Sequence, residues 1–202
     1  MTAASQRSKL LRHARRKAVV SRADLMRIGV HHETAGRLVR EGVLDRIARG
    51  QYRLANADVT MHHGLAVVAA SVPRGVICLV SALRFHDIGT QTSRETWLAI
   101  ERRGRTPVLA YPRLHVVRFS GKAFTSGIQH HRIEGRRVRI YSIAKTIADC
   151  FKYRHKIGLD VALEALVDAW RSRRVKMAEL DRYSRICRVH NVMRPYLEAL
   201  IV

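Results

Sequence analysis

Apolar residues in the first 60 positions recur every three or four residues, and polar residues fill the gaps between them. This period predicts short amphipathic helices, and the alternating stretch that follows predicts strands. The predicted elements are helices over residues 8–18, 22–28 and 32–41 and strands over residues 43–47 and 51–54. Ser21 is suited to cap the second helix, and Gly50 can adopt the positive φ of the turn between the strands. Two helices joined by a short turn and followed by a hairpin indicate a winged helix-turn-helix.

The rest of the chain mixes helical and strand periods after a short linker at residues 56–58. The predicted elements are helices over 61–71 and 79–86, strands over 96–101, 115–119, 128–133 and 137–141, and helices over 142–153, 159–172, 177–189 and 194–201. Strands followed by a run of helices are typical of the α+β class. We therefore predict an N-terminal winged helix-turn-helix at residues 1–56 and a mixed α/β domain at residues 57–202 that ends in a helical bundle.

The charge of the chain narrows the choice of partner. There are 38 Lys and Arg residues against 16 Asp and Glu, which gives a formal net charge of +22 and a pI of about 11.3. Seven basic residues and no acidic residue stand in the first 23 positions. A polyanion is the natural partner of such a chain, and double-stranded DNA suits the predicted N-terminal fold. The alternative is a solvated basic face on a purely structural three-helix unit.

The candidate DNA contacts follow from the helix and hairpin periods. Ala35, Leu38 and Val39 fall on one face of the helix over 32–41, which leaves Arg37 and Arg40 on the opposite face for a major groove. In the hairpin, Tyr52 and Leu54 are expected to point inward, and Gln51 and Arg53 outward. The candidate DNA-binding residues are His31, His32, Thr34, Arg37 and Arg40 of the recognition helix, Arg46, Arg49, Gln51 and Arg53 of the wing, and Arg12, Arg15 and Arg16 of the first helix.

A second basic surface is expected in the C-terminal part. Val138 and Ile140 alternate with two arginines, so one face of that strand is buried and the other basic. The candidate residues are Arg102, Arg103, Arg105, Arg118, Arg137 and Arg139. DNA phosphates, an acidic protein partner and a charged, guarded sheet edge are all compatible with this pattern. Lys145 and Asp149, four positions apart, are expected to pair on the solvated face of the helix over 142–153.

Enzymatic function finds little support in the sequence. The His pairs are adjacent, so their rings diverge, and the P-loop and HExxH patterns do not occur. Asp87 and Glu101 offer a weak alternative, a Mg²⁺-dependent nuclease, but Arg103 stands where such sites carry lysine. We therefore expect a protein that is not an enzyme and that needs no cofactor and no metal ion.

The cysteines and the apolar runs indicate the cellular compartment in which the protein is expected. Cys78, Cys150 and Cys187 lie far apart, which suits a reducing compartment. The apolar runs are too short to span a bilayer, and the basic N-terminus lacks the apolar core of a signal peptide. We expect a cytoplasmic protein without membrane contact.

Four motifs in this order resemble the AbiEi family of antitoxins from type IV toxin–antitoxin systems. They are RIARGQYRL at 46–54, SALRFHDIG at 81–89, YSIAKTIADCFK at 141–152 and KIGLD at 156–160. The family often has proline where this chain has Ile143, a change that affects only the first turn of a helix. The motifs span nearly the whole chain.

The resemblance implies an N-terminal winged helix-turn-helix joined to a C-terminal antitoxin domain. It implies a repressor that binds inverted repeats in its own promoter, and an antitoxin that neutralises a nucleotidyltransferase-type toxin. Whether the toxin is contacted directly stays open. A plain winged-helix regulator, whose second domain binds a ligand or dimerises, is the alternative.

Overall fold

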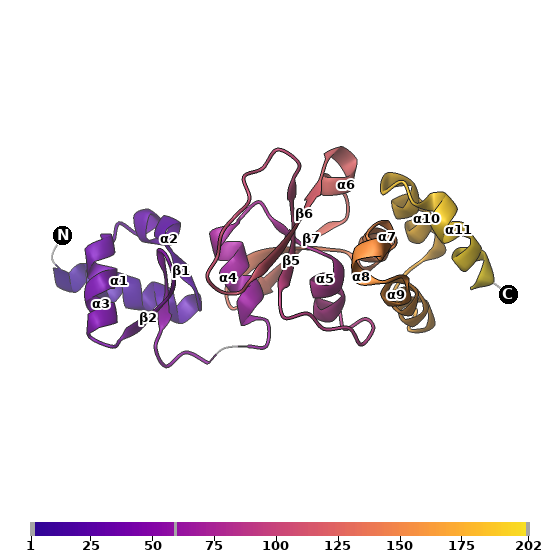
Figure 1. Ribbon diagram of the computed structural model, residues 1–202. Coiled ribbons are helices and arrows are strands. Elements are labelled where there is room, and N and C mark those ends of the chain that lie inside the picture. The colour runs from indigo at the N-terminus through magenta and orange to yellow at the C-terminus, as the bar shows by residue number, and fades with distance from the viewer. Residues whose placement is uncertain (1–2, 59, 201–202) are drawn as a thin grey trace. The chain divides into compact units, whose positions relative to one another are not determined.

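The computed structural model describes residues 3–58 and 60–200, and it begins with the elements of a winged helix-turn-helix (Figure 1). These elements are α1 (Ala3–Arg16), β1 (Val20–Ser21), α2 (Arg22–Arg27), α3 (His32–Arg40), β2 (Leu44–Ala48) and β3 (Gln51–Leu54). Ser21 caps α2 through a reciprocal pair of bonds with Asp24, and Gly50 has a φ of +71° between β2 and β3. The predicted order of helix, turn, helix and hairpin is therefore confirmed.

A strand absent from the prediction completes the small N-terminal sheet. β1 pairs antiparallel with β3, so the sheet has the order β1-β3-β2. Leu10, Leu25 and Leu38, one from each helix, are at most 2% exposed and pack together with Tyr52 of β3. Apolar side chains from α1, α2, α3 and the hairpin thus share one core, which fixes the outward face of α3.

The chain divides into two compact units, and each unit is built from three separate segments of the sequence. The first unit comprises Met1–Arg74, Pro107–Arg113 and His131–Val138, and the second comprises Gly75–Thr106, Leu114–His130 and Arg139–Val202. α4 (His63–Ser71) belongs to the first unit. The division of the chain into folding domains at residues 1–56 and 57–202 stays a prediction.

The strands that follow the winged helix in the sequence form a five-stranded sheet of order β6-β5-β4-β8-β7. Its strands are β4 (Val76–Ile77), β5 (Thr96–Glu101), β6 (Leu114–Phe119), β7 (Ile128–Ile133) and β8 (Arg136–Tyr141). β5 runs parallel to β6 and antiparallel to β4, and β4 runs parallel to β8. The tip of the β7–β8 hairpin, His131–Val138, belongs to the first unit.

Most helices of the second unit gather around α7, and the helices of this unit are seven in the described part of the chain. They are α5 (Leu79–Phe85), α6 (Gly121–Thr125), α7 (Ile143–Lys152), α8 (Arg154–Ile157), α9 (Leu159–Arg171), α10 (Met177–Ile186) and α11 (His190–Ala199). Figure 1 shows α7 among its neighbours, and it contacts α5, α8, α9, α10 and α11. The α+β class and the helical C-terminal region are confirmed. α11 begins four residues earlier than predicted, and α6 and α8 were missed.

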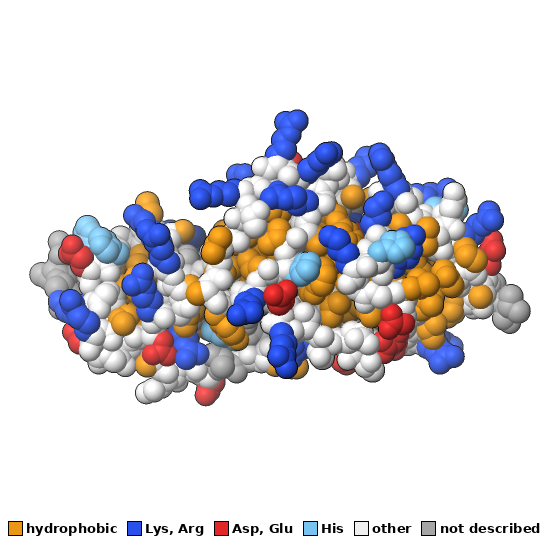
Figure 2. Space-filling model, in the orientation of Figure 1, with side chains coloured by type: hydrophobic (Ala, Val, Ile, Leu, Met, Phe, Trp, Pro, Cys, Tyr) orange, Lys and Arg blue, Asp and Glu red, His pale blue; other side chains and the backbone are white. Residues whose placement is uncertain are grey.

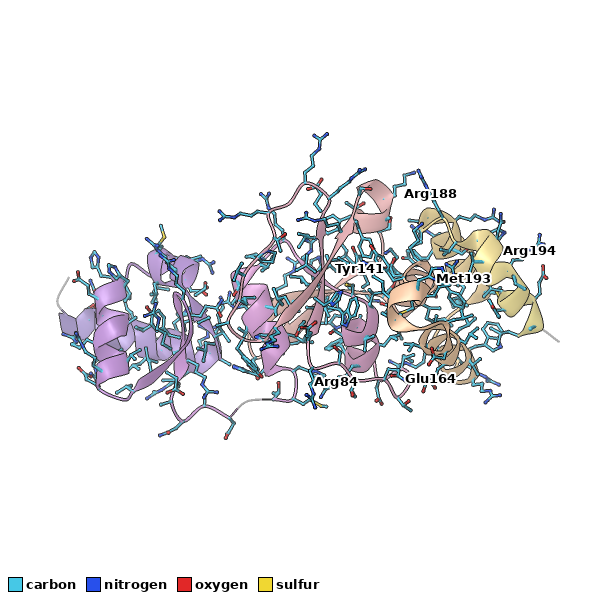
Figure 3. The ribbon with its side chains drawn as sticks, in the orientation of Figure 1. Arg84, Tyr141, Glu164, Arg188, Met193 and Arg194 are labelled. Carbon is cyan, nitrogen blue, oxygen red and sulfur yellow. The ribbon has the colours of Figure 1, made fainter. Side chains whose placement is uncertain are left out.

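The expected solvated face of α7 is wrong. Lys145 is 0% and Asp149 1% exposed, and the lysine Nζ lies 2.7 Å from the Asp149 Oδ1. The ammonium also lies 4.1 Å from the centre of the Tyr141 ring, which is labelled in Figure 3, and Cys187 donates to Asp149 at 3.3 Å. Burial raises the pKa of Asp149, an effect that the charge of Lys145 opposes. Helices pack against α7 on several sides, so a charged pair at helical spacing is enclosed instead of exposed.

Candidate nucleic-acid interface

The recognition helix presents its N-terminal histidines to solvent. His31 is the N-cap residue of α3, and His31 and His32 are exposed. Ala35 and Leu38 are completely buried on the opposite side. The amphipathic pattern therefore orients α3 as predicted, and its first turn is accessible to a large ligand.

Thr34 is a correction to the predicted contact set. It is 8% exposed, and its hydroxyl donates to the Gln6 Oε1 at 2.8 Å. Thr34 precedes Ala35 and lies one turn before Leu38, so it shares their inward face. It ties α3 to α1 and is not available to a base edge.

Arg37 and Arg40 differ in their surroundings. Arg40 is exposed, and no ion pair joins it to another described residue. The Arg37 side chain is 43% exposed, and its Nε lies 3.6 Å from the Glu41 Oε1. Glu41 also pairs with Arg7. The Arg37 side chain is thus partly exposed, and Glu41 neutralises part of its charge.

The wing contains a second correction, at Gln51. A register shift separates the pairs Arg46–Tyr52 and Ala48–Gln51, so Gln51 and Tyr52 are both buried although they are neighbours on β3. The Gln51 side-chain amide donates to Ser71 of α4. Tyr52 points inward as predicted, and Gln51, expected to point outward, does not.

Two arginines remain available on the wing. Arg53 lies opposite Asp45 on β2 and pairs with it, with 3.0 Å between the guanidinium and the carboxylate. Arg46 and Arg49 are exposed, and neither pairs with an acidic side chain in the described part of the chain. Arg12, Arg15 and Arg16 are likewise exposed on α1. Figure 2 shows Lys and Arg side chains spread widely over the drawn face, with few acidic side chains between them.

The buried carboxylate of Asp24, which the sequence analysis did not identify, stabilises the start of α2. Asp24 is 0% exposed and accepts from the Ser21 amide at 3.0 Å, from its hydroxyl at 2.6 Å and from Arg136. Burial acts to raise the pKa of Asp24, but the bonds from Ser21 and Arg136 outweigh burial and lower the pKa. The spacing of Ser21 and Asp24 is the signal of a capping box. Arg136, 112 positions away, has no local signal.

The hairpin tip that carries Arg136 makes further contacts within the first unit. Arg136 also donates to the Val19 carbonyl at 2.7 Å, and the Glu134 carbonyl accepts from the Ala18 amide at 3.1 Å. The Glu134 carboxylate lies 2.8 Å from the His63 Nδ1 and accepts from the Thr60 amide at 2.8 Å. Burial opposes ionisation of Glu134, but the bonds from His63 and Thr60 lower its pKa. A segment distant in sequence thus braces the start of α2.

A shallow groove of about 420 Å³ lies beside the wing tip. It is lined by the start of α2, by Arg49, Gly50 and Gln51, by the end of α4 and by residues 108–110. Val108 is 95% exposed at its edge. The groove places a basic wing tip next to an open, partly apolar surface.

The arginines predicted to form the second basic surface differ in their location and surroundings. Arg102, Arg103 and Arg105 are exposed in the loop between β5 and β6, and Arg137 is exposed on β8. The Arg139 guanidinium lies 5.9 Å from the centre of the Phe124 ring. Arg118 is exposed, and its guanidinium donates to the carbonyls of Arg102 and Gly104.

The carboxylates of the nuclease alternative lie on different elements. Asp87 follows α5 with a φ of +54°, and Glu101 ends β5. Within residues 3–58 and 60–200, no group of three His, Cys, Asp or Glu side chains is arranged to hold a metal ion. No helix in these ranges combines the length and apolar character needed to cross a bilayer.

Comparisons with known proteins agree with the geometry of the N-terminal unit. Residues 8–55 match the family model described as transcriptional regulator, AbiEi antitoxin. The fold is similar to the crystal structure of the RV2827C protein from Mycobacterium tuberculosis, with a TM-score of 0.59 and 14% sequence identity over 89% of this chain and 71% of that chain. No curated protein matches the sequence. The predicted resemblance to AbiEi regulators is confirmed over residues 8–55.

Proposed function

From the match of residues 8–55 to AbiEi transcriptional regulators, we propose that this protein binds duplex DNA through its winged helix and represses its own operon. In this proposal the first turn of α3 enters the major groove, where His31 and His32 face the base edges. Arg46 and Arg49 of the wing face the neighbouring phosphates.

The observation that carries the proposal is a set of exposed arginines on the winged helix that form no ion pair with a described acidic side chain. Arg40, Arg46 and Arg49 are exposed, and no described acidic side chain pairs with them. Of the nearby acids, Asp24 is buried, Asp45 pairs with Arg53 and Glu41 pairs with Arg7 and Arg37, whereas Glu33 in the first turn of α3 is exposed and offsets part of this charge. A helix face and hairpin with this charge suit a phosphate-lined groove.

We further propose that the C-terminal part acts as an antitoxin against a nucleotidyltransferase-type toxin, without enzymatic activity of its own. Support comes from the motif at residues 141–152, which resembles the antitoxin domain. Most of this motif lies in α7, where residues 144–151 are buried. The motif therefore specifies the core of the second unit, and the surface that would meet a toxin must be supplied by other residues.

A gel-shift titration with the chain's own upstream region tests DNA binding. Replacing Arg40, Arg46 and Arg49 with Gln should weaken binding at least tenfold, because each contact to a phosphate or base contributes about 1 kcal/mol or more. The matched control is the triple variant Arg84→Gln, Arg94→Gln and Arg171→Gln, which removes the same charge from exposed positions in the second unit. Equal affinity for the two triple variants would refute the interface.

Co-expression with the neighbouring gene tests the antitoxin role. If the gene encodes a nucleotidyltransferase, the full chain should restore growth, and so should the winged-helix triple variant if neutralisation does not need DNA. A toxic neighbour that is not neutralised, with operator binding intact, would favour the plain regulator with a ligand-binding or dimerising second part.

A further inference from the structure

Gln51 places an unpaired hydrogen-bond acceptor in the wall of the groove beside the wing tip. Its side chain is buried, and its amide nitrogen donates to the Ser71 hydroxyl. Ser71 uses its own hydrogen to donate to the Val67 carbonyl at 3.2 Å, so it can only accept from Gln51. The Gln51 Oε1 is therefore left without a donor among the described residues. A buried acceptor in this state is stabilised when a donor reaches it.

Two arginines give one end of the groove a positive charge. The pairing of β1 with β3 sets Ser21 opposite Gln51, so Arg22 lies next to the wing tip. A Cβ added to Gly50 would lie 3.5 Å from the Arg22 Cβ. Arg22 and Arg49 are exposed, and no ion pair joins either of them to a described acidic side chain. None of the described residues that line the groove is acidic, so this end favours an anion.

The rest of the lining is largely apolar. Ala23, Ala48 and Ala70 contribute to it, and so do residues 108–110. Val108 is 95% exposed, so its side chain gains from being covered. Sites for small molecules are typically apolar hollows of about 300–1,000 Å³ that carry a few polar groups. The groove, with a volume of about 420 Å³, has this combination of size and lining.

We propose that this groove binds a small apolar carboxylic acid that carries a hydroxyl group, and that the bound acid lowers the affinity of the protein for DNA. The carboxylate pairs with Arg22 and Arg49 at the charged end. The hydroxyl donates to the Gln51 Oε1, and the apolar body of the acid covers Val108. An inorganic anion would satisfy the arginines but would leave Gln51 and Val108 without a partner.

The effect on DNA rests on the proposed function, in which Arg49 faces a phosphate. A carboxylate bound to Arg49 competes with that phosphate and offsets the positive charge of the wing tip. Affinity for the chain's own upstream duplex should therefore fall about fivefold or more when the groove is saturated. The slope of log K against log salt should fall by about one, since one phosphate contact is lost. The acid would thus relieve repression.

Calorimetric titration of the full chain without DNA tests the site alone. The probes are para-hydroxyphenylacetate, phenylacetate, which lacks the hydroxyl, and the methyl ester of para-hydroxyphenylacetate, which lacks the charge. The hydroxy acid should bind at least about tenfold more tightly than either of the others, because each of them loses one charge-assisted or neutral hydrogen bond. Absence of binding by the hydroxy acid, or equal affinity for all three probes, would overturn the proposal.

Exposed variants assign the binding to the groove. Val108→Glu adds a negative charge to the lining, so affinity for para-hydroxyphenylacetate should fall at least about tenfold. Met61→Glu is the matched control, because Met61 is 76% exposed and does not line the groove. Its affinity should equal that of the wild type. Equal losses in the two variants would place the binding elsewhere and refute the groove.

Gln51→Met tests the hydroxyl contact. Methionine has a similar length but lacks the amide oxygen, so the variant should bind para-hydroxyphenylacetate no better than phenylacetate. Thermal melting checks that the variant is folded, and if it is not, the comparison of Val108→Glu with Met61→Glu decides. A folded variant that keeps the preference for the hydroxy acid would contradict the assignment of Gln51.

Fluorescence anisotropy on the upstream duplex tests the regulation. Para-hydroxyphenylacetate should lower the affinity of the wild-type chain, and phenylacetate at the same concentration should not. Unchanged affinity and salt slope with the groove saturated would contradict the regulatory step. Failure of the winged-helix proposal looks different. The chain would then show no preference for its upstream duplex over a shuffled one, with or without the acid, while the calorimetric titrations would still decide whether the groove binds it.

Discussion

Asp24 is a buried carboxylate that holds α2 and the β7–β8 hairpin tip together without being exposed on the candidate interface. Its carboxylate is inaccessible, yet it caps α2, receives Arg136 from the distant hairpin and lies 3.1 Å from the Lys17 ammonium. A buried carboxylate is tolerated when hydrogen bonds and cations surround it. Asp24 is therefore a structural support of the candidate interface and not a contact in it.

Replacing Asp24 with Ala should destabilise the protein by about 3 kcal/mol or more, because Arg136, whose side chain is only 12% exposed, would then keep a largely buried charge without its partner. Urea unfolding followed by circular dichroism measures this loss. Asp45→Ala is the control, since its pair with Arg53 is partly exposed and should contribute less than about 1 kcal/mol. Similar losses for the two variants would show that the hairpin contact is dispensable.

Titratable groups in the first unit should make stability fall as the pH is lowered. Burial lowers the pKa of His13 below its ordinary value of 6.5, so the folded state resists protonation and loses stability below that pH. The lowered pKa of Glu134 adds stability above its ordinary value of 4.5, and this is lost as the pH falls through its folded pKa.

Thermal melting of the wild type should therefore decline from pH 7 to pH 4. The variant Glu134→Gln should melt lower at pH 7 and show a flatter decline below pH 5. A melting temperature that rises on acidification, or a variant with the same slope as the wild type, would contradict the assignment.

At the scale of elements, most helices and strands follow from local pattern. Ser21, Gly50 and the spacing of apolar residues in α3 placed the winged helix correctly. The strands β1 and β4 are only two residues long, so no alternation of apolar and polar residues reveals them in the sequence. They form by pairing with β3 and β5, which lie elsewhere in the chain. Strict alternation predicted Gln51 outward, but the register shift opposite Ala48 turns it inward.

The candidate site residues could be predicted only where the period of their own helix or strand decides whether the side chain is exposed. His31, His32 and Arg40 lie on the free face of an amphipathic helix, and the structure leaves them exposed. Thr34, Gln51 and the α7 charges are buried by residues far away in sequence, which no local pattern encodes.

Docking of the β7–β8 hairpin tip can be tested with a pair of glycines. A Cβ on Gly135 would lie 2.1 Å from the Arg16 carbonyl oxygen, whereas a Cβ on Gly42 would meet nothing within 4 Å. Both have similar positive φ, so Gly42→Ala should cost about 1 kcal/mol from backbone strain alone. Gly135→Ala should cost clearly more in chemical denaturation, since the tip must move away from α1. Equal costs would mean that the tip is not held there.

At the scale of the whole molecule, charge and fold both favour the proposed binding to DNA. A net charge of +22 gives general attraction to polyanions, which any basic chain would share. The winged helix adds a defined face, and residues 8–55, which form it, match AbiEi transcriptional regulators.

Methylation protection on the chain's own upstream duplex tests the central claim most directly, because dimethyl sulfate reports guanine N7 in the major groove. The account predicts protected guanines in the upstream repeat with the wild-type chain, and loss of this protection with His32→Ala combined with Arg40→Gln. Binding to that duplex with no protected guanine, or equal binding to a shuffled duplex, would contradict it.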